Sequence, residues 1–238
     1  TRTLAVAAVQ DRVLQTAVAA YMEPFLEREF DDCSFGYRRG RGVRLAVERV
    51  HTYYQQGYRW LVDADIDSFF DSVDRELLLS RLGSLIPDET AVRLCRLWLD
   101  CAIWDGLHLI RAGRGIPQGA VVSPMLANLC LDTLDDRLTA AGILMVRYAD
   151  DFVLLAKNRP AAERALRMAA EELAALRLKL KDSKTRVARF SDGFRFLGVI
   201  FLKDMLAQPW RTGRKRPKVI SSAPPIPARC LPAAERRP

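Results

Sequence analysis

The stretch RYADDFVLLAK, residues 147–157, places two adjacent aspartates, Asp150 and Asp151, within a strongly apolar segment. The chain reads ILMV just before this stretch, and FVLL follows the aspartates. Unpaired carboxylates are costly to bury, so the pair adds no stability at this position. Either it marks a turn that carries both side chains into water, or it binds something positively charged.

Two strand-like runs, Leu144–Tyr148 and Phe152–Ala156, flank the pair at hairpin spacing. The aspartates are then expected in a tight turn at the rim of a sheet. Because aspartate favours turns, this pattern alone indicates a structural hairpin. A catalytic interpretation requires a second acidic group from another part of the chain.

That second group occurs in RWLVDADIDSFFDSVD, residues 59–74. Alternation in a strand at 59–67 predicts one apolar face and one face that becomes acidic towards its end, with Asp63, Asp65 and Asp67. Two acidic strand ends brought together form an all-oxygen site suited to Mg²⁺. The alternative is a solvated acidic edge followed by a helix cap at Ser72 or Asp74.

Between the two acidic segments lies GRGIPQGAVVSP, residues 113–124. Gly115 and Gly119 leave a backbone that a bulky ligand can approach closely. Ser123 and Pro124 predict the start of a helix, with the serine as N-cap. Such a loop is often a plain connection, but its place between the acidic segments makes it a candidate for ligand binding.

The chain of 238 residues is half hydrophobic, which is typical of a globular protein with one large domain or two small ones. Helical and strand patterns alternate without a strict period, which favours an α+β fold over a doubly wound parallel sheet. The expected helices are Val6–Phe25, Val43–Gln55, Arg75–Leu85, Thr90–Ile103, Pro124–Ala140 and Pro160–Leu178. The expected strands are Arg59–Ile66, Leu107–Ala112, Leu144–Tyr148, Phe152–Ala156, Thr185–Arg189 and Phe194–Phe201.

The net charge of +8 is concentrated at the C-terminal end. Residues 207–238 hold eight of the basic residues, one acidic residue and seven of the prolines, which leaves the rest of the chain close to neutral. This basic, Pro-rich segment is either an arm that touches phosphates or a solvated linker. Net charge therefore does not establish nucleic-acid binding by the body of the protein.

The five cysteines form no C-x-x-C pair, and with only two histidines they argue against a zinc site. Scattered thiols are typical of a reducing compartment, so we expect a cytoplasmic protein. No apolar run is long enough to span a bilayer and no signal-peptide pattern opens the chain, so no membrane partner is expected. The chain begins at Thr1, which suggests a processed product or a piece of something longer.

Five segments in order resemble the successive palm motifs of reverse transcriptases, most closely those of the bacterial group II intron-like lineage. They are DADIDSFFD, GIPQGAVVSPMLAN, YADDFVLL, KLKDSKTRV and FRFLGVIF. SFGYRRGRGVRLAVERV, residues 34–50, is similar to the fingers segment of that lineage. The wording YRRGRG and VDADIDSFFDSVD most resembles reverse transcriptases associated with CRISPR adaptation genes, which are often linked to a spacer integrase.

The resemblance implies a right-hand polymerase with fingers and a palm, in which an antiparallel palm sheet packs on helices. Residues 1–56 would form fingers and N-terminal helices, residues 57–206 the palm with a fingers segment around 75–115, and residues 207–238 a tail or linker. Only about forty residues follow Gly198, and they are Pro-rich. A helical thumb is therefore absent or not recognisable.

The resemblance also implies the site. Asp65, Asp150 and Asp151 match the catalytic aspartates that hold two Mg²⁺ ions, for which Mn²⁺ is a possible substitute. Asp150 would be a direct ligand, Asp151 a weaker or outer one, and the carbonyl of Ile66 a further ligand. Lys184 matches a proposed general acid towards pyrophosphate, or is an exposed surface lysine.

Nucleotide and primer contacts follow from the same match. Arg38 would contact the triphosphate, and Gln118 would lie near the nucleotide and template base. Phe70 would be the steric gate that favours dNTPs over rNTPs, or an ordinary core residue beside Phe69. The expected primer and template residues are Pro117, Gly119, Tyr148, Ala149, Phe196, Leu197 and Gly198.

The implied function is that of an RNA-directed DNA polymerase that adds dNTPs to the 3′-hydroxyl of a DNA or RNA primer on an RNA template. It would serve CRISPR spacer acquisition, with a fused or separate integrase as partner. The alternatives are a group II intron maturase-type or other bacterial defence reverse transcriptase, and a docking domain for an integrase or RNA with little activity of its own. A palm-type nucleotide cyclase is disfavoured because no GGDEF-like turn is present.

Overall fold

The structure is a computed structural model, and it describes residues 6–104, 107–111, 113–202 and 205–207. The chain divides into two compact units. The first contains the described parts of residues 1–30, 67–133 and 174–178, and the second those of residues 31–66, 134–173 and 179–238. The basic segment expected at 207–238 lies outside the described residues after position 207.

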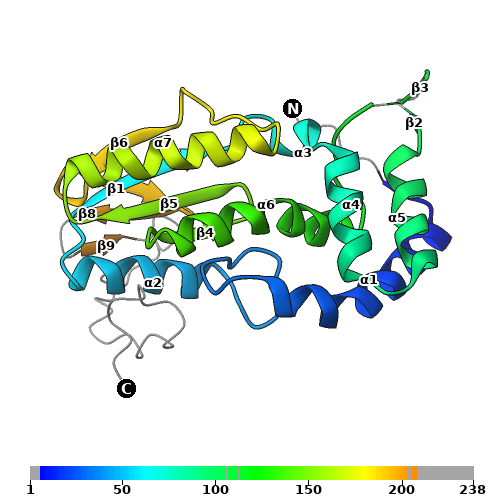
Figure 1. Ribbon diagram of the computed structural model, residues 1–238, viewed down its shortest axis with the longest axis horizontal. Coiled ribbons are helices and arrows are strands. Elements are labelled where there is room, and N and C mark those ends of the chain that lie inside the picture. The colour runs from blue at the N-terminus through cyan, green and yellow to red at the C-terminus, as the bar shows by residue number, and fades with distance from the viewer. Residues whose placement is uncertain (1–5, 105–106, 112, 203–204, 208–238) are drawn as a thin grey trace, which may run out of the picture. The chain divides into compact units, whose positions relative to one another are not determined.

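The second unit is built on a four-stranded antiparallel sheet with the order β4-β5-β1-β6. The strands are β4 (Leu144–Tyr148), β5 (Asp151–Ala156), β1 (Trp60–Asp65) and β6 (Arg186–Arg189). One face packs on α2 (Val43–Gln55), and Figure 1 shows α7 (Arg159–Ala175) along the other side. These strands and α2 agree with the expected elements to within a residue or two, and the α+β class is confirmed.

Both faces of β1 are covered by protein. Leu61 and Val62 point to opposite faces of the strand, and both are 0% exposed. Helices cover both sides of the sheet, so both faces of the first half of the strand are apolar, and the expectation of a face that becomes acidic only towards its end is confirmed. Acidic character is confined to its end, at Asp63 and Asp65.

A second antiparallel sheet contains β7 (Phe194–Phe196), β8 (Val199–Leu202) and β9 (Met205–Ala207). The single strand expected at Phe194–Phe201 is wrong, since the chain reverses at Leu197 and Gly198, whose φ angles are +49° and +78°. Positive φ at both central residues is what a tight two-residue hairpin turn requires, and glycine adopts it at little cost. The short 3₁₀ helix η1 (Phe190–Asp192) precedes this sheet.

The first unit is mainly helical. It contains α1 (Val9–Glu29), α3 (Phe69–Ser72), α4 (Arg75–Leu85), α5 (Glu89–Asp100) and a short hairpin of β2 (Ile103–Trp104) and β3 (Leu109–Ile110). Helix α6 (Ser123–Ala140) begins in this unit and ends in the second. Asp74 caps α4 by accepting hydrogen bonds from the amides of Glu76 and Leu77, so the cap is Asp74 rather than Ser72.

Four of the expected elements have different limits in the structure, and the first is the helix expected at Val6–Phe25, which is observed at Val9–Glu29. The helix expected to reach Ile103 ends at Asp100, and the one expected to reach Leu178 ends at Ala175, shortly before Arg177 with a φ of +59°. The expected strand Leu107–Ala112 is reduced to β3. None of the helices in the described ranges is both long and apolar enough to cross a membrane.

Candidate active site

The two acidic strand ends meet in the second unit. Strands β1 and β5 are antiparallel neighbours, and their register places Asp65 opposite Asp151. Asp150 lies in the turn between β4 and β5, directly before Asp151. The hairpin and the acidic strand therefore bring Asp65 and the aspartate pair to the same edge of one sheet.

Burial and neighbouring negative charges make ionisation of the carboxylates at this edge less favourable. Asp65 is 8% exposed, whereas Asp151 is open to solvent. Partial burial, followed by the charges of Asp65 and Asp150, raises the pKa of Asp151 to about 6. Burial also raises the pKa of Asp63, against the opposing effect of Arg186. Like charges held this close favour a bound cation.

The segment around Lys184 is attached to the same edge. The Nζ of Lys184 lies 2.6 Å from Oδ2 of Asp65, and this hydrogen bond is the main cause that raises the pKa of the lysine. The amide of Lys181 donates to the carbonyl of Asp65 at 2.8 Å, and Ile66 forms a β-bridge with Leu180. Lys184 is therefore held within reach of the aspartates by backbone pairing.

A cavity of about 630 Å³ opens onto this edge within the second unit. It unites the acidic strand ends, the Lys184 segment and the turn between β7 and β8. Its lining residues are Asp63, Asp65, Asp151, Ser183, Lys184, Thr185, Arg186, Arg195, Leu197 and Gly198.

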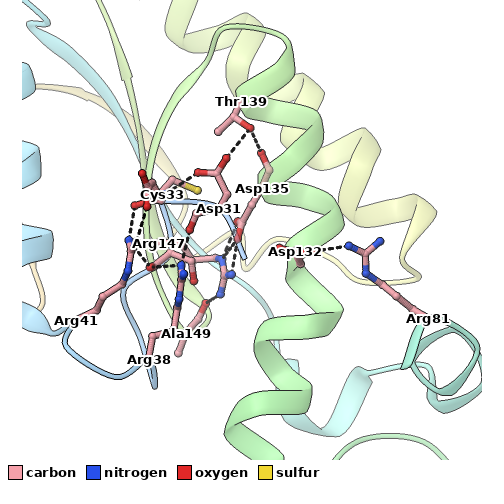
Figure 2. Close-up of polar contacts among 12 residues, drawn as sticks. Asp31, Cys33, Arg38, Arg41, Arg81, Asp132, Asp135, Thr139, Arg147 and Ala149 are labelled. Carbon is pink, nitrogen blue, oxygen red and sulfur yellow. Dashed lines mark hydrogen bonds and ion pairs between the residues drawn. The ribbon is translucent and has the colours of Figure 1, made fainter. Parts of the chain in front are cut away.

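Arg38 belongs to the loop of residues 31–42 in the second unit and is 7% exposed. Its guanidinium donates to the carbonyls of Asp31 and Ser34, so in this structure it holds the loop backbone (Figure 2). Tyr37 from the same loop lies 6.4 Å, ring to ring, from Tyr148. The loop thus lies next to the strand that leads into the aspartate turn.

Phe70, Pro117, Gln118 and Gly119 belong to the first unit. The amide of Ile116 donates to the carbonyl of Phe70 at 2.6 Å, and that of Gly115 to Val73 at 2.8 Å. The partly buried Phe70 ring packs against Phe69, with centroids 5.5 Å apart. The predicted gate is therefore hydrogen-bonded to the loop that carries Pro117, Gln118 and Gly119.

The donor atoms at the acidic edge suit a hard cation. Across the described part of the chain, no group of three or more acidic, cysteine or histidine side chains is arranged so that it could hold a metal ion. The oxygens of Asp65 and Asp151 are nevertheless of the type that Mg²⁺ prefers. The ammonium of Lys184 already pairs with Asp65, which shows that this carboxylate takes a cationic partner.

Three residues beside the aspartate turn had no role assigned from the sequence. Arg147 and Asp135 form an ion pair in which both side chains are fully buried, and Gly36 packs on the backbone of Ala149. A charged residue inside an apolar strand and an aspartate on an apolar helix were the available signals. Neither signal indicates that Arg147 and Asp135 are partners, because the two residues lie on different elements.

Known proteins similar to this chain share its fold. Residues 1–201 match the family model described as "Reverse transcriptase (RNA-dependent DNA polymerase)". Protein YkfC of Escherichia coli (strain K12) is 30% identical over 83% of this chain and 62% of its own length. Group II intron-encoded protein LtrA of Lactococcus lactis subsp. cremoris is 31% identical over 56% of this chain and 22% of LtrA. The chain thus spans less than two thirds of these curated relatives.

Solved structures agree on the architecture. Telomerase from Candida tropicalis, solved with a fragment of telomeric RNA, superposes with a TM-score of 0.62 at 14% identity. The alignment covers 85% of this chain and 37% of the telomerase chain. At this identity the likeness shows the fold alone, which is a fingers-and-palm fold with helices and an antiparallel sheet.

Proposed function

We propose that this chain, which belongs to the reverse transcriptase (RNA-dependent DNA polymerase) family, extends a primer with deoxynucleotides on an RNA template. The observation that carries the proposal is the register of β1 and β5, which places Asp65 opposite Asp151, the residue that follows Asp150 in the chain. This is the edge at which a template-directed nucleotidyl transfer would take place.

The chemistry requires charge neutralisation around a transferring phosphoryl group. Asp65, Asp150 and Asp151, with the carbonyl of Ile66, would hold two Mg²⁺ ions. When bound, these ions activate the primer 3′-hydroxyl and neutralise the charge that develops on the leaving pyrophosphate. Asp150 is the direct ligand in this proposal, and Asp151 the weaker one.

Lys184 would act as the proton donor to the leaving pyrophosphate. Its pKa is raised by the hydrogen bond to Asp65, so the ammonium is fully protonated at neutral pH. In this structure it pairs with Asp65, and that ion pair must open before the ammonium can reach a phosphate oxygen. Lys184 would therefore exchange one anionic partner for another during the cycle.

Further residues would position the nucleotide and the primer. Phe70 would exclude the 2′-hydroxyl of an rNTP, while Arg38 and Gln118 would contact the triphosphate and the base pair. The turn at Leu197 and Gly198 lines the acidic cavity and would support the primer end. The remaining proposed primer and template contacts are Pro117, Gly119, Tyr148, Ala149 and Phe196.

The biological setting that we propose is spacer acquisition from RNA, with a spacer integrase as partner in the cytoplasm. The sequences of the segments YRRGRG and VDADIDSFFDSVD support this setting. The similarity to LtrA favours a second candidate, an intron maturase-type reverse transcriptase. Both settings use the same RNA-templated chemistry.

The decisive experiment is primer extension on poly(rA) with oligo(dT), Mg²⁺ and dTTP. We expect extension by the parent protein and its loss in Asp150→Ala, whereas Glu171→Gln, on the exposed surface of α7, should match the parent. Extension by Asp150→Ala at the parental rate would refute the site. A folded parent without Mg²⁺-dependent extension would instead support a docking domain for an integrase or RNA.

A further inference from the structure

The aspartate turn rests on a buried ion pair. Arg147 of β4 and Asp135 of α6 are each 0% exposed. Nε of Arg147 donates to Oδ1 and Oδ2 of Asp135 at 2.8 and 3.0 Å, and Nη2 donates to Oδ2 as well (Figure 2). The planar guanidinium is thereby fixed in orientation as well as in position.

Such a pair is not explained by stability. Removing two charges from water costs several kcal/mol per ion, and well-packed apolar residues of similar volume are often as stable or more so. A role other than stability is therefore indicated for the pair, through the other N–H donors of the guanidinium.

A further contact of Arg147 reaches the aspartate turn. Nη1 of Arg147 donates to the carbonyl of Ala149 at 3.1 Å. Ala149 has a φ of +58°, a conformation that costs a residue with a Cβ about 1–2 kcal/mol. The residue that follows is Asp150, so the hydrogen bond acts on the peptide unit that joins the strained residue to the proposed metal ligand.

The opposite side of the turn is closed by a glycine. A Cβ on Gly36 would lie 2.5 Å from the amide nitrogen of Ala149, which is closer than any real contact. The loop that carries Gly36 is itself paired with β4, because Arg147 donates to the carbonyl of Cys33 and accepts from the amide of Phe35, each at 2.8 Å. The turn is therefore held from one side by the Arg147 hydrogen bond and from the other by the close approach of Gly36.

We propose that Arg147 is a positioning residue, which together with Asp135 and Gly36 fixes the Ala149 peptide so that Asp150 and Asp151 are presented to a divalent cation. It touches neither substrate nor cation and acts through the backbone of the turn. The inference rests on the proposed function only for its catalytic consequence. Its direct consequence, cation affinity, can be measured without primer, template or nucleotide.

The primary test is Arg147→Lys, which keeps the charge beside Asp135 but loses the planar fork that reaches Ala149. Mn²⁺ binding to the metal-free protein is followed by electron paramagnetic resonance, and extension kinetics are measured in parallel. We expect Mn²⁺ affinity and kcat to fall about 10- to 100-fold, as for other residues that orient metal ligands, with little change in the KM for dTTP.

The matched control is Arg81→Lys. Arg81 also pairs with a buried aspartate of α6, Asp132, but it makes no described contact with the turn. We expect this variant to bind Mn²⁺ and extend primers as the parent does. Equal losses in Arg147→Lys and Arg81→Lys would overturn the proposal, since the effect would then be structural.

A second variant covers the case in which Arg147→Lys does not fold. Gly36→Ala leaves the ion pair intact and displaces the turn from the other side, so it should also weaken Mn²⁺ binding. Parental Mn²⁺ affinity in folded Gly36→Ala would overturn the proposal. A parent that binds Mn²⁺ but does not extend primers would refute the proposed function alone.

Discussion

The turn before Asp150 and the loop before Gln118 both carry proposed site residues, but different forces hold them. The turn is fixed by charge, through the fully buried Arg147 and Asp135. The loop is fixed by close backbone fit, because Gly115 has a φ of +86° and a Cβ there would lie 2.6 Å from the carbonyl of Phe70. We therefore expect a broken charge balance to disrupt the turn but not the loop, whereas added volume should disrupt both.

Arginines also differ between the two regions. In the loop, Nε of Arg75 donates to the carbonyl of Gly115 and Nη2 of Arg114 to that of Ser72, each at 2.8 Å. Arg114 is exposed, so its bond competes with water and contributes little. Arg147 has no access to water, and its partners cannot be replaced by solvent.

The largest effect is expected from breaking the charge balance of the turn. Arg147→Met leaves Asp135 buried without its counter-charge and should lower the free energy of unfolding by about 3–5 kcal/mol. Urea unfolding followed by circular dichroism measures it. The double variant Arg147→Met with Asp135→Leu should regain most of this stability but not the Mn²⁺ affinity.

That double variant separates stability from positioning. A single variant that loses less than about 1 kcal/mol would show that the pair is not electrostatically coupled to the fold. A double variant with both parental stability and parental Mn²⁺ affinity would show that the ion pair is dispensable for the turn. The turn would then not be held by charge.

An intermediate effect is expected from adding volume to the loop. Gly115→Ala forces a Cβ against the carbonyl of Phe70 and the Cα of Asp71, at 2.6 and 2.8 Å, and should destabilise by about 1–3 kcal/mol. Because Phe70 is the proposed gate, the preference for dTTP over UTP should also change. The control is Gly113→Ala, whose Cβ would meet no atom within 4 Å. Unchanged sugar selectivity in a destabilised Gly115→Ala protein would show that the loop does not control the position of the proposed gate, Phe70.

The sequence predicted what depends on local pattern and on motif order. The hairpin around Asp150 and the strand ending at Asp65 followed from alternation and spacing, and their meeting at one sheet edge followed from the acidic ends. The roles proposed for Phe70, Gln118 and Lys184 came from the family resemblance and stay predictions.

Side-chain pairings between elements distant in the chain could not be predicted from the sequence pattern. Arg147 and Asp135 lie on a strand and a helix, and neither residue's neighbours specify which charge will face it. The strand pattern alone ran across the reversal at Leu197, because FRFLGVIF is apolar apart from Arg195 and one glycine in such a run is compatible with a continuous strand. The positive φ at Ala149 is accompanied by tertiary contacts with Arg147 and Gly36, which no local propensity specifies.

The smallest effect is expected on the solvent side of the turn, at Asp151. Its pKa of about 6 lies above the value of about 4 for an unfolded aspartate, so the folded metal-free protein binds this proton more tightly. The contribution of Asp151 to the free energy of unfolding therefore falls as pH rises from about 4 to about 6, and stays low above that range. Asp151→Asn removes the repulsion and should melt higher than the parent at pH 7, by up to about 3 °C after solvent screening.

The same substitution tests whether charge repulsion at Asp151 lowers the melting temperature of the protein. Thermal melts at pH 4 and pH 7, without divalent cations, should show the difference between Asp151→Asn and the parent shrinking at the lower pH. Addition of Mn²⁺ at pH 7 should raise the melting temperature of the parent more than that of the variant, because the cation replaces the proton as the partner of this carboxylate. A variant that melts below the parent at pH 7 would show that the Asp151 carboxylate stabilises the metal-free protein, against the repulsion expected from Asp65 and Asp150.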